Sequence, residues 1–180
     1  MRVTGGELRG RTVHMPPGIT RPAMDRMRVS LFSILGDLAE TSFLDLFSGS
    51  GLVAIEAWSR GARPVVLVER ERVKRPVILR NLADLSPKPI VRIEPAERFV
   101  ARNPRAFDIV YLDPPFAYPH KQDLLQRLGR SRSIHTGTRI VMHAPRDEAF
   151  SPVASLIQSD RREYGGSVLT FFDPTEPSVE

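Results

Sequence analysis

The spacing of hydrophobic residues changes along the chain, and each spacing predicts a type of secondary structure. Between residues 24 and 38 the apolar side chains recur every three or four positions, which is typical of an amphipathic helix. They are Met24, Met27, Leu31, Ile34, Leu35 and Leu38. Beyond this segment, short runs of consecutive apolar residues alternate with stretches of helical spacing, as buried strands and their covering helices do.

The apolar runs predict a sheet whose strands are separated by helices. Strands are expected at residues 42–47, 64–69, 88–94, 107–113 and 138–144. Helices are expected at residues 52–59, 70–85, 96–102 and 121–130. A last pair of strands is expected within residues 156–172, with its turn at Gly165 and Gly166. Because strands joined through helices pair in parallel, we expect an α/β fold with a seven-stranded, doubly wound, mostly parallel sheet.

The two ends of the chain differ in composition from this regular middle. Residues 1–14 hold two short strand-like stretches around GGELRG, which indicates a β-hairpin, and a connector rich in proline and glycine follows. The last residues are rich in proline and acid. We therefore expect a basic N-terminal hairpin extension at residues 1–22, one α/β domain at 23–174 and a flexible tail at 175–180.

The bulk composition narrows the class of protein. The chain has 180 residues, 41% hydrophobic and 26% charged, which suits one domain with a sizeable core. No apolar run is long enough to span a membrane, and the polar, basic N-terminus predicts no secretory leader. The absence of cysteine excludes a disulfide framework and a thiolate metal site. We therefore expect a cytoplasmic protein. We also expect no metal site, because the histidines lack the spacing of metal ligands.

The charged residues are unusual in their kind. The net charge is +5, and of 26 basic residues only Lys74, Lys88 and Lys121 are lysines. Arginine pairs with phosphate through two hydrogen bonds and stacks on bases, so the bias is consistent with a nucleic-acid partner. A genome rich in G and C, which favours arginine codons, explains the same bias equally well.

A first candidate site follows the strand at residues 42–47. Gly49 and Gly51 lie where ligands bind in such folds, beyond the carboxyl ends of the strands, and Glu69 ends the next strand. An acid there can accept hydrogen bonds from a ribose diol. With Ala54 the glycines match a dinucleotide pattern, but Asp45 would repel a pyrophosphate and would attract the cationic groups of S-adenosylmethionine. The simpler alternatives are a tight turn and a solvated acid.

A second candidate site is the sequence LDPPF. Asp113 ends the strand at residues 107–113, and the two prolines after it have no backbone N–H. The aspartate and the proline carbonyl would accept the two N–H groups of a base amino group and turn its lone pair toward a methyl donor. Phe116 would stack on the base, which must be unpaired or flipped out. The alternative is a rigid exit from a strand.

The order of these motifs resembles amino-methyltransferases that use S-adenosylmethionine and carry a (D/N)-P-P-(Y/F/W) motif. More narrowly, RVTGGELRGR, TRPAMDRMRVSLFSIL and YGGSVLTFF resemble the RsmD family of bacterial methyltransferases, from Arg2 to about Phe172. Members of this family methylate guanine N2 in small-subunit (16S) ribosomal RNA. The resemblance implies a Rossmann-like class I methyltransferase fold and S-adenosyl-L-methionine as cofactor. It also implies 16S ribosomal RNA as the substrate. Nothing in the sequence indicates more than a monomer, and because the protein is small and its basic patch modest, we expect it to act on a small subunit or an assembly intermediate.

The resemblance also implies roles for particular residues. The catalytic residues would be Asp113, Pro114, Pro115 and Phe116. The cofactor would be bound by Asp45, Phe47, Ser48, Gly49, Ser50, Gly51, Glu69, Arg70, Ala96 and Glu97. The RNA would be bound by Arg9, Arg11, Arg21, Arg28 and His120. The N-terminal hairpin would contact RNA with its basic residues.

The chain departs from the family pattern in three places. Pro95 stands where an acid often reads the adenine ring, so that contact would shift to Glu94, Glu97 or the backbone. Val29 replaces an acid, and the strand at residues 138–144 ends within MHAP, with His143 and Ala144, where an acid is common in the family. Other functions stay open: a DNA adenine-N6 methyltransferase, a non-catalytic protein that binds S-adenosylmethionine or RNA, and an NAD-dependent oxidoreductase.

Overall fold

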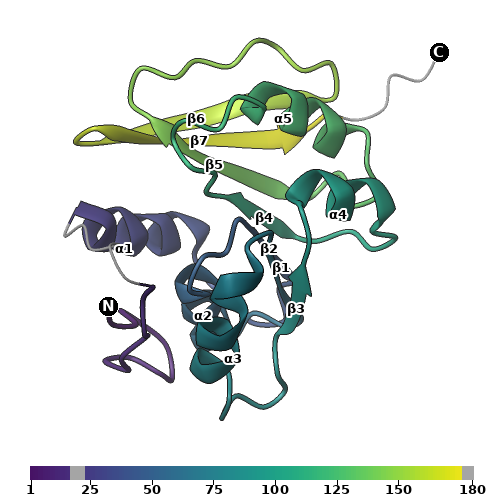
Figure 1. Cartoon of the computed structure of the whole chain (residues 1–180). Helices are drawn as coiled ribbons and strands as arrows, with labels where there is room; N and C mark the ends of the chain where they lie inside the picture. The colour runs from purple at the N-terminus through teal and green to yellow at the C-terminus, as the bar shows by residue number, and fades with distance from the viewer. Residues whose placement is uncertain (17–22, 176–180) are drawn as a thin grey trace.

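A seven-stranded sheet forms the centre of the computed structural model, which describes residues 1–16 and 23–175, with the backbone alone for Ala23 and Met24 (Figure 1). The strand order is β3-β2-β1-β4-β5-β7-β6. The strands are β1 (Phe43–Leu46), β2 (Val65–Glu69), β3 (Ile90–Ile93), β4 (Ile109–Leu112), β5 (Arg139–Pro145), β6 (Leu156–Tyr164) and β7 (Ser167–Pro174). Strands β1 to β5 pair in parallel, and β7 pairs antiparallel with β5 and β6. The predicted seven-stranded, mostly parallel sheet is confirmed.

Helices cover both faces of the sheet, so that it has two cores (Figure 1). The helices are α1 (Ala23–Leu35), α2 (Leu52–Ser59), the 3₁₀ turn η1 (Arg72–Lys74), α3 (Arg75–Asn81), α4 (Ala96–Arg102) and α5 (Lys121–Gly129). One core packs α1, α2 and α3 on the sheet, and the other packs α4 and α5. Strands β1, β2 and β4 are buried along their whole length, as continuous apolar runs in a parallel sheet require.

The helices deviate from their expected ends at two places. Helix α1 ends at Leu35, and Gly36 follows with a φ of 74°, although Leu38 beyond it is still buried. The helix expected at residues 70–85 is divided into η1 and the shorter α3, whose first turn holds Pro76. No helix in the described part of the chain combines the length and apolar character needed to cross a membrane.

The N-terminal segment, residues 1–14, folds back on itself: the amides of Val3 and Val13 donate to the carbonyls of Arg11 and Met1, at 2.9 and 2.8 Å. One antiparallel bridge joins Arg2 to Thr12, and Val3 and Val13 insert into the core beside α1 and α2. The turn between them also binds α2: the amides of Glu7 and Leu8 both donate to Ser59. The backbone groups of this segment are thus satisfied partly by its own opposite stretch and partly by a helix.

The order of the strands places the candidate chemistry at one edge. The sheet begins at β1, in its centre. The chain then adds β2 and β3 on one side of β1 and afterwards β4 and β5 on the other. In such a sheet the crevice beyond the carboxyl ends of the two central strands is the ligand-binding position. Here those strands are β1 and β4, which end at Leu46 and Leu112 in register.

Candidate active site

A cavity of about 620 Å³ lies beyond the carboxyl ends of β1, β2 and β4. It is lined by Met15, Met27, Phe47, Ser48, Gly49, Ser50, Leu52, Val53, Glu69, Arg70, Glu71, Lys74, Asp113, Pro114, Pro115, Phe116, His143, Tyr164, Gly166 and Ser167. Residues from both sites that the sequence indicated therefore line one cavity. A second cavity of about 680 Å³, between α4 and α5, contains no residue of either site.

The loop after β1 is held by Glu69, at the end of β2. Glu69 is 4% exposed, and its Oε2 accepts a hydrogen bond of 2.9 Å from the amide of Gly49. Its Oε1 accepts another, of 2.8 Å, from the amide of Glu71. Gly49 and Gly51 have φ values of 60° and 83°, and a Cβ on Gly51 would lie 3.0 Å from Leu67. Both glycines are thus required by backbone conformation, and the second also by packing.

Asp45 lies beneath this loop and is 1% exposed. Its partner is the hydroxyl of Ser48, which donates at 2.7 Å. Burial raises the pKa of Asp45 to about 8, with a smaller contribution from the negative charges of Asp113 and Glu69, although the Ser48 hydrogen bond acts in the opposite direction. Three acidic side chains therefore lie together here, and a cationic ligand would stabilise the ionised form of Asp45.

Asp113 follows β4 directly, and its carboxylate binds a histidine that the sequence analysis did not assign to the site. The distance between Asp113 Oδ1 and His143 Nδ1 is 2.7 Å. Pro114 is buried, and Pro115 and Phe116 are exposed beside it. The rings of Phe116 and His143 meet edge to face, with 5.4 Å between their centroids. The sequence analysis noted His143 only as part of MHAP, where the resemblance to the family led us to expect an acid.

Lys121 is a second residue that the sequence analysis did not assign to the site. It is 4% exposed at the start of α5, and its ammonium donates to the carbonyls of Phe116 and Tyr118, at 2.8 and 2.9 Å. Glu148 forms an ion pair with the same ammonium, at 3.1 Å. A buried ammonium needs such partners, so the loop after Asp113 is tied to α5 and to the segment after β5.

Some residues expected at the cofactor lie outside the cavity. Ala96 is buried in the core under α4, and Glu97 binds the hydroxyl of Tyr118. Glu94 pairs with Arg98 at 3.6 Å and does not line the cavity either. Gly51 is the N-cap of α2 and does not line the cavity. The structure therefore brings no acid from the segment after β3 to the cavity, and the adenine contact stays a prediction.

The residues expected to bind RNA have different environments. Arg9 and His120 are exposed, and His120 packs edge to face on Tyr118, with 5.6 Å between the centroids. Arg11 is partly buried, because its guanidinium donates to the carbonyl of Asn81 at 2.8 Å and pairs with Asp84 at 2.5 Å. Arg21 lies outside the described residues.

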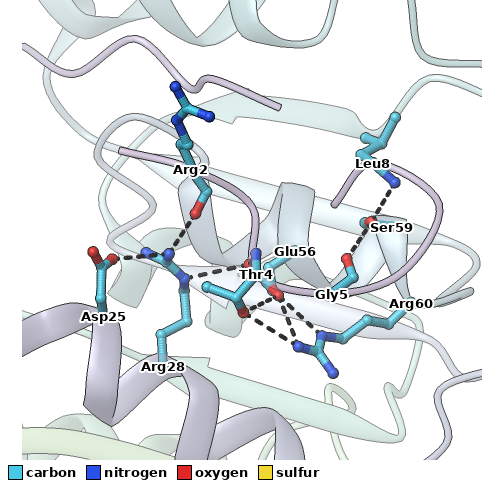
Figure 2. Close-up of polar contacts among 9 residues, drawn as sticks. All are labelled: Arg2, Thr4, Gly5, Leu8, Asp25, Arg28, Glu56, Ser59 and Arg60. Atoms are coloured by element: carbon cyan, nitrogen blue, oxygen red, sulfur yellow. Dashed lines mark hydrogen bonds and ion pairs between the residues drawn. The ribbon is translucent and has the colours of Figure 1, made fainter. Parts of the chain in front are cut away.

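Arg28 was expected to face RNA phosphates, and the structure contradicts this. It is 1% exposed, and its Nη2 donates to the carbonyl of Arg2 at 2.6 Å and pairs with Asp25 at 2.9 Å (Figure 2). Its Nε lies 3.3 Å from the carboxylate of Glu56, which is itself fully buried. Arg28 therefore neutralises a buried acid and joins α1 to the N-terminal segment and α2.

Glu56 is the centre of this network (Figure 2). Its carboxylate accepts hydrogen bonds from the amide and hydroxyl of Thr4, at 2.8 and 2.6 Å, and pairs with Arg60 at 2.9 Å. Two arginines and two neutral donors thus compensate one buried charge. The basic N-terminal segment is held in a fixed place beside α1, whose Met27 lines the cavity, as does Met15.

The chain is similar to known proteins over nearly its whole length. The model of the family described as Conserved hypothetical protein 95 matches residues 1–173. Ribosomal RNA small subunit methyltransferase D of Escherichia coli is 38% identical over 120 residues, which are 64% of this chain and 60% of that protein. YlbH of Bacillus subtilis, named as a candidate rRNA methyltransferase, is 30% identical over 173 residues, covering 92% of this chain and 94% of YlbH.

Solved structures show the same fold. The structure of yhhF from Escherichia coli, described as a candidate methyltransferase, superposes with a TM-score of 0.87 at 28% identity, covering 97% of each chain. The Thermus thermophilus protein TTHA0928 gives a TM-score of 0.81 at 29% identity, covering 95% of this chain and 98% of its own. The expected Rossmann-like class I methyltransferase fold is therefore confirmed. The chain belongs to the family described as Conserved hypothetical protein 95, which is the RsmD family.

Proposed function

We propose that this protein transfers a methyl group from S-adenosyl-L-methionine to the exocyclic N2 amino group of a guanine in small-subunit (16S) ribosomal RNA. One observation carries the proposal: Asp113 and Pro114 line the same cavity as Gly49 and Glu69. A group that can hold a base amino nitrogen thus lies beside a loop suited to a nucleoside cofactor. The relatives named for rRNA methylation support the choice of RNA as the acceptor.

The residues of the cavity fit S-adenosylmethionine. Its sulfonium and ammonium are cationic, and three acids line the cavity, Glu69, Glu71 and Asp113, while Asp45 is buried beneath the loop. The two glycines leave room for close backbone approach, and Glu69, which lines the cavity, would accept hydrogen bonds from ribose hydroxyls. A dinucleotide pyrophosphate would meet three acids instead, which disfavours the alternative of an NAD-dependent enzyme.

The chain's own residues would prepare the acceptor nitrogen. When bound, the cofactor supplies an electrophilic methyl group on sulfur. The free oxygen of Asp113 and the carbonyl of Pro114 each accept one N–H of the amino group, which draws the nitrogen toward tetrahedral geometry and aims its lone pair. Phe116 stacks on the base. As the N–C bond forms, the methyl–sulfur bond would break and leave S-adenosylhomocysteine, and the Asp113 carboxylate would take up the proton that the nitrogen loses.

We further propose how the enzyme meets its substrate. Arg9 and His120 are exposed basic residues from the N-terminal segment and from the loop before α5, and both would contact RNA. Residues 23–174 would form the methyltransferase domain, with residues 1–22 as its RNA-contacting extension. We propose a cytoplasmic monomer that acts on an assembled or partly assembled small subunit, because a small basic surface gains orientation from a preformed particle.

The closest rival is DNA adenine-N6 methylation, because the amino group of adenine would suit Asp113 and Pro114 equally well. Enzymes of that kind add a target-recognition insertion, and only residues 117–120 separate Phe116 from α5. A non-catalytic binding protein is disfavoured because the Asp113 carboxylate is presented to the cavity and oriented by His143. Both observations therefore favour RNA methylation over these two rivals.

The test is transfer of labelled methyl groups from S-adenosylmethionine to three acceptors: unmethylated small ribosomal subunits, naked small-subunit RNA and duplex DNA. Digestion of the product to nucleosides should give labelled N2-methylguanosine. Asp113→Ala should lower the rate at least about 100-fold. Asp123→Ala, which removes an acid paired with Arg127 on α5, should not change it. Label in N6-methyladenosine from DNA, or cofactor binding without transfer to any acceptor, would refute the proposal.

A further inference from the structure

We propose that His143 is a positioning residue for methyl transfer: its Nδ1–H binds one oxygen of Asp113 and leaves the other oxygen for the substrate amino group. The inference rests on the proposed function, because Asp113 is the group that His143 would position. It concerns a residue at which this chain departs from the family pattern, where an acid is common at the end of this strand.

Neighbouring strands bring the two side chains together. Leu112 and Met142 are partners in the parallel register of β4 and β5, so the residues that follow them, Asp113 and His143, lie side by side. The amide of Asp113 donates to the carbonyl of Leu46 in β1 at 3.2 Å, and His143 is paired with Leu169 in β7. Both backbones are therefore fixed by the centre of the sheet, and the 2.7 Å contact does not depend on a mobile loop.

The surroundings of the imidazole determine which nitrogen carries the proton. His143 is 5% exposed, and its Nε2 is buried without a hydrogen-bond partner among the described residues. A proton on Nε2 alone would leave the Nδ1 lone pair facing a carboxylate oxygen, and two acceptors repel. Nδ1 therefore carries a proton, and His143 acts as a hydrogen-bond donor to Asp113.

This hydrogen bond defines what Asp113 presents to the cavity. Oδ1 is bound by Nδ1 of His143, and the buried hydroxyl of Tyr111 lies near the same carboxylate. These contacts hold the carboxylate in one orientation, and in the proposal its Oδ2 and the carbonyl of Pro114 face the amino group. That gives two acceptors for the two N–H groups of an unmethylated amino group. Orientation of this kind is worth a large part of a methyl-transfer barrier.

His143 also contacts the other end of the motif. Its ring meets Phe116 edge to face at 67°, so that one imidazole touches both the residue that would hold the amino group and the residue that would stack on the base. Tyr111 lies below, with its hydroxyl buried; burial raises its pKa well above the ordinary value, and the charges of Asp113 and Asp45 add to this. Tyr111 therefore stays neutral beside the pair.

The alternative is that His143 only fills the core, and two substitutions separate the possibilities. In His143→Asn the side-chain amide can donate from nearly the position of Nδ1, whereas His143→Leu has no donor. The matched control is His135→Leu, which breaks the other histidine–aspartate pair, between His135 Nε2 and Asp108 Oδ1 at 3.0 Å. Asp108 precedes β4 and Asp113 follows it, so the control lies at the opposite edge of the sheet.

The experiment measures kcat and KM for the RNA acceptor, the Kd of S-adenosylhomocysteine and the thermal midpoint of each variant. His143→Leu should lower kcat about 10- to 100-fold with KM and Kd within about twofold. His143→Asn should recover most of kcat, and His135→Leu should keep it. The inference is wrong if His143→Leu keeps the wild-type kcat, or if Asn and Leu lower kcat equally in step with stability. If the wild-type protein methylates no RNA, the proposed function fails and the inference falls with it.

Discussion

The ammonium of Lys121 donates a hydrogen bond of 2.8 Å to the main-chain carbonyl of Phe116. This contact joins the first residue of α5 to the last residue of the D-P-P-F motif. The same ammonium also donates to the carbonyl of Tyr118, so α5 holds the loop that would shape the base pocket. The stacking residue can therefore be perturbed without any change to its own side chain.

Lys121→Met should loosen the loop while the methylene stem remains packed. We expect kcat for RNA methylation to fall about 10-fold, because misplacement of reacting groups is costly, while cofactor affinity stays near the wild-type value. The free energy of unfolding should fall by about 1–3 kcal/mol, because two carbonyls and Glu148 lose their buried partner. Lys88→Met, at an exposed lysine before β3, is the control. A wild-type kcat in Lys121→Met would contradict the role of this contact.

Asp45 should make stability depend on pH. Its folded-state pKa is about 8, above the ordinary 3.8, so its favourable contribution is complete below about pH 4 and is lost as the pH rises toward 8. Over that window wild-type stability should fall relative to Asp45→Asn by up to about 1.4 kcal/mol per pH unit. Urea unfolding from pH 4 to pH 9 measures the difference, with Asp147→Asn as an exposed control. Parallel curves for wild type and Asp45→Asn would refute the assignment.

Two glycines of the N-terminal segment should respond differently to alanine. Both have left-handed backbones, with φ of 77° at Gly6 and 87° at Gly10. A Cβ on Gly6 would lie 1.9 Å from the carbonyl oxygen of Ser59, whereas a Cβ on Gly10 would meet nothing within 4 Å. Gly10→Ala should therefore cost about 1–2 kcal/mol from backbone strain alone. Gly6→Ala should cost on the order of 4 kcal/mol, and equal thermal midpoints for the two variants would contradict this.

Arg28 and Arg9 should separate stability from RNA binding. Arg28→Met leaves Glu56 with one arginine partner, so we expect a loss of about 3 kcal/mol in the free energy of unfolding and unchanged RNA affinity of the folded protein. Arg9→Glu removes an exposed positive charge. It should leave the thermal midpoint unchanged, weaken RNA binding and reduce the slope of log Kd against log salt by about 1. The opposite pattern would show that the two arginines had been assigned the wrong roles.

Most of the fold could be predicted from the sequence, because parallel strands buried on both faces leave an unbroken apolar signal. Strands β1, β2 and β4 have such runs, and each is followed by a helix of regular spacing. The packing of the N-terminal segment on α2 could not be predicted, because its short strand-like stretches carry no information about the helix that binds the turn between them. The prediction that Arg28 faces RNA was wrong for a similar reason, because its position in a basic stretch does not reveal a buried acid on another helix.

The candidate site was predictable where it follows the ends of strands. Residues 47–50, Glu69 and residues 113–116 all line the cavity, since the carboxyl ends of parallel strands share one edge. His143 and Lys121 could not be placed at the site, because each acts through a contact with the D-P-P-F motif that only the folded chain creates. Their roles, like those of the other site residues, stay predictions until the variants are measured.

The hydrogen bond between Ser30 in α1 and Tyr164 in β6 joins residues 134 positions apart. Tyr164, Gly166 and Ser167 form one wall of the cavity, and β7 inserts between β5 and β6. This wall is therefore made from strands that come later in the chain than the D-P-P-F motif. The pocket beside Asp113 is thus enclosed only when the antiparallel strands β6 and β7 have joined the parallel part of the sheet.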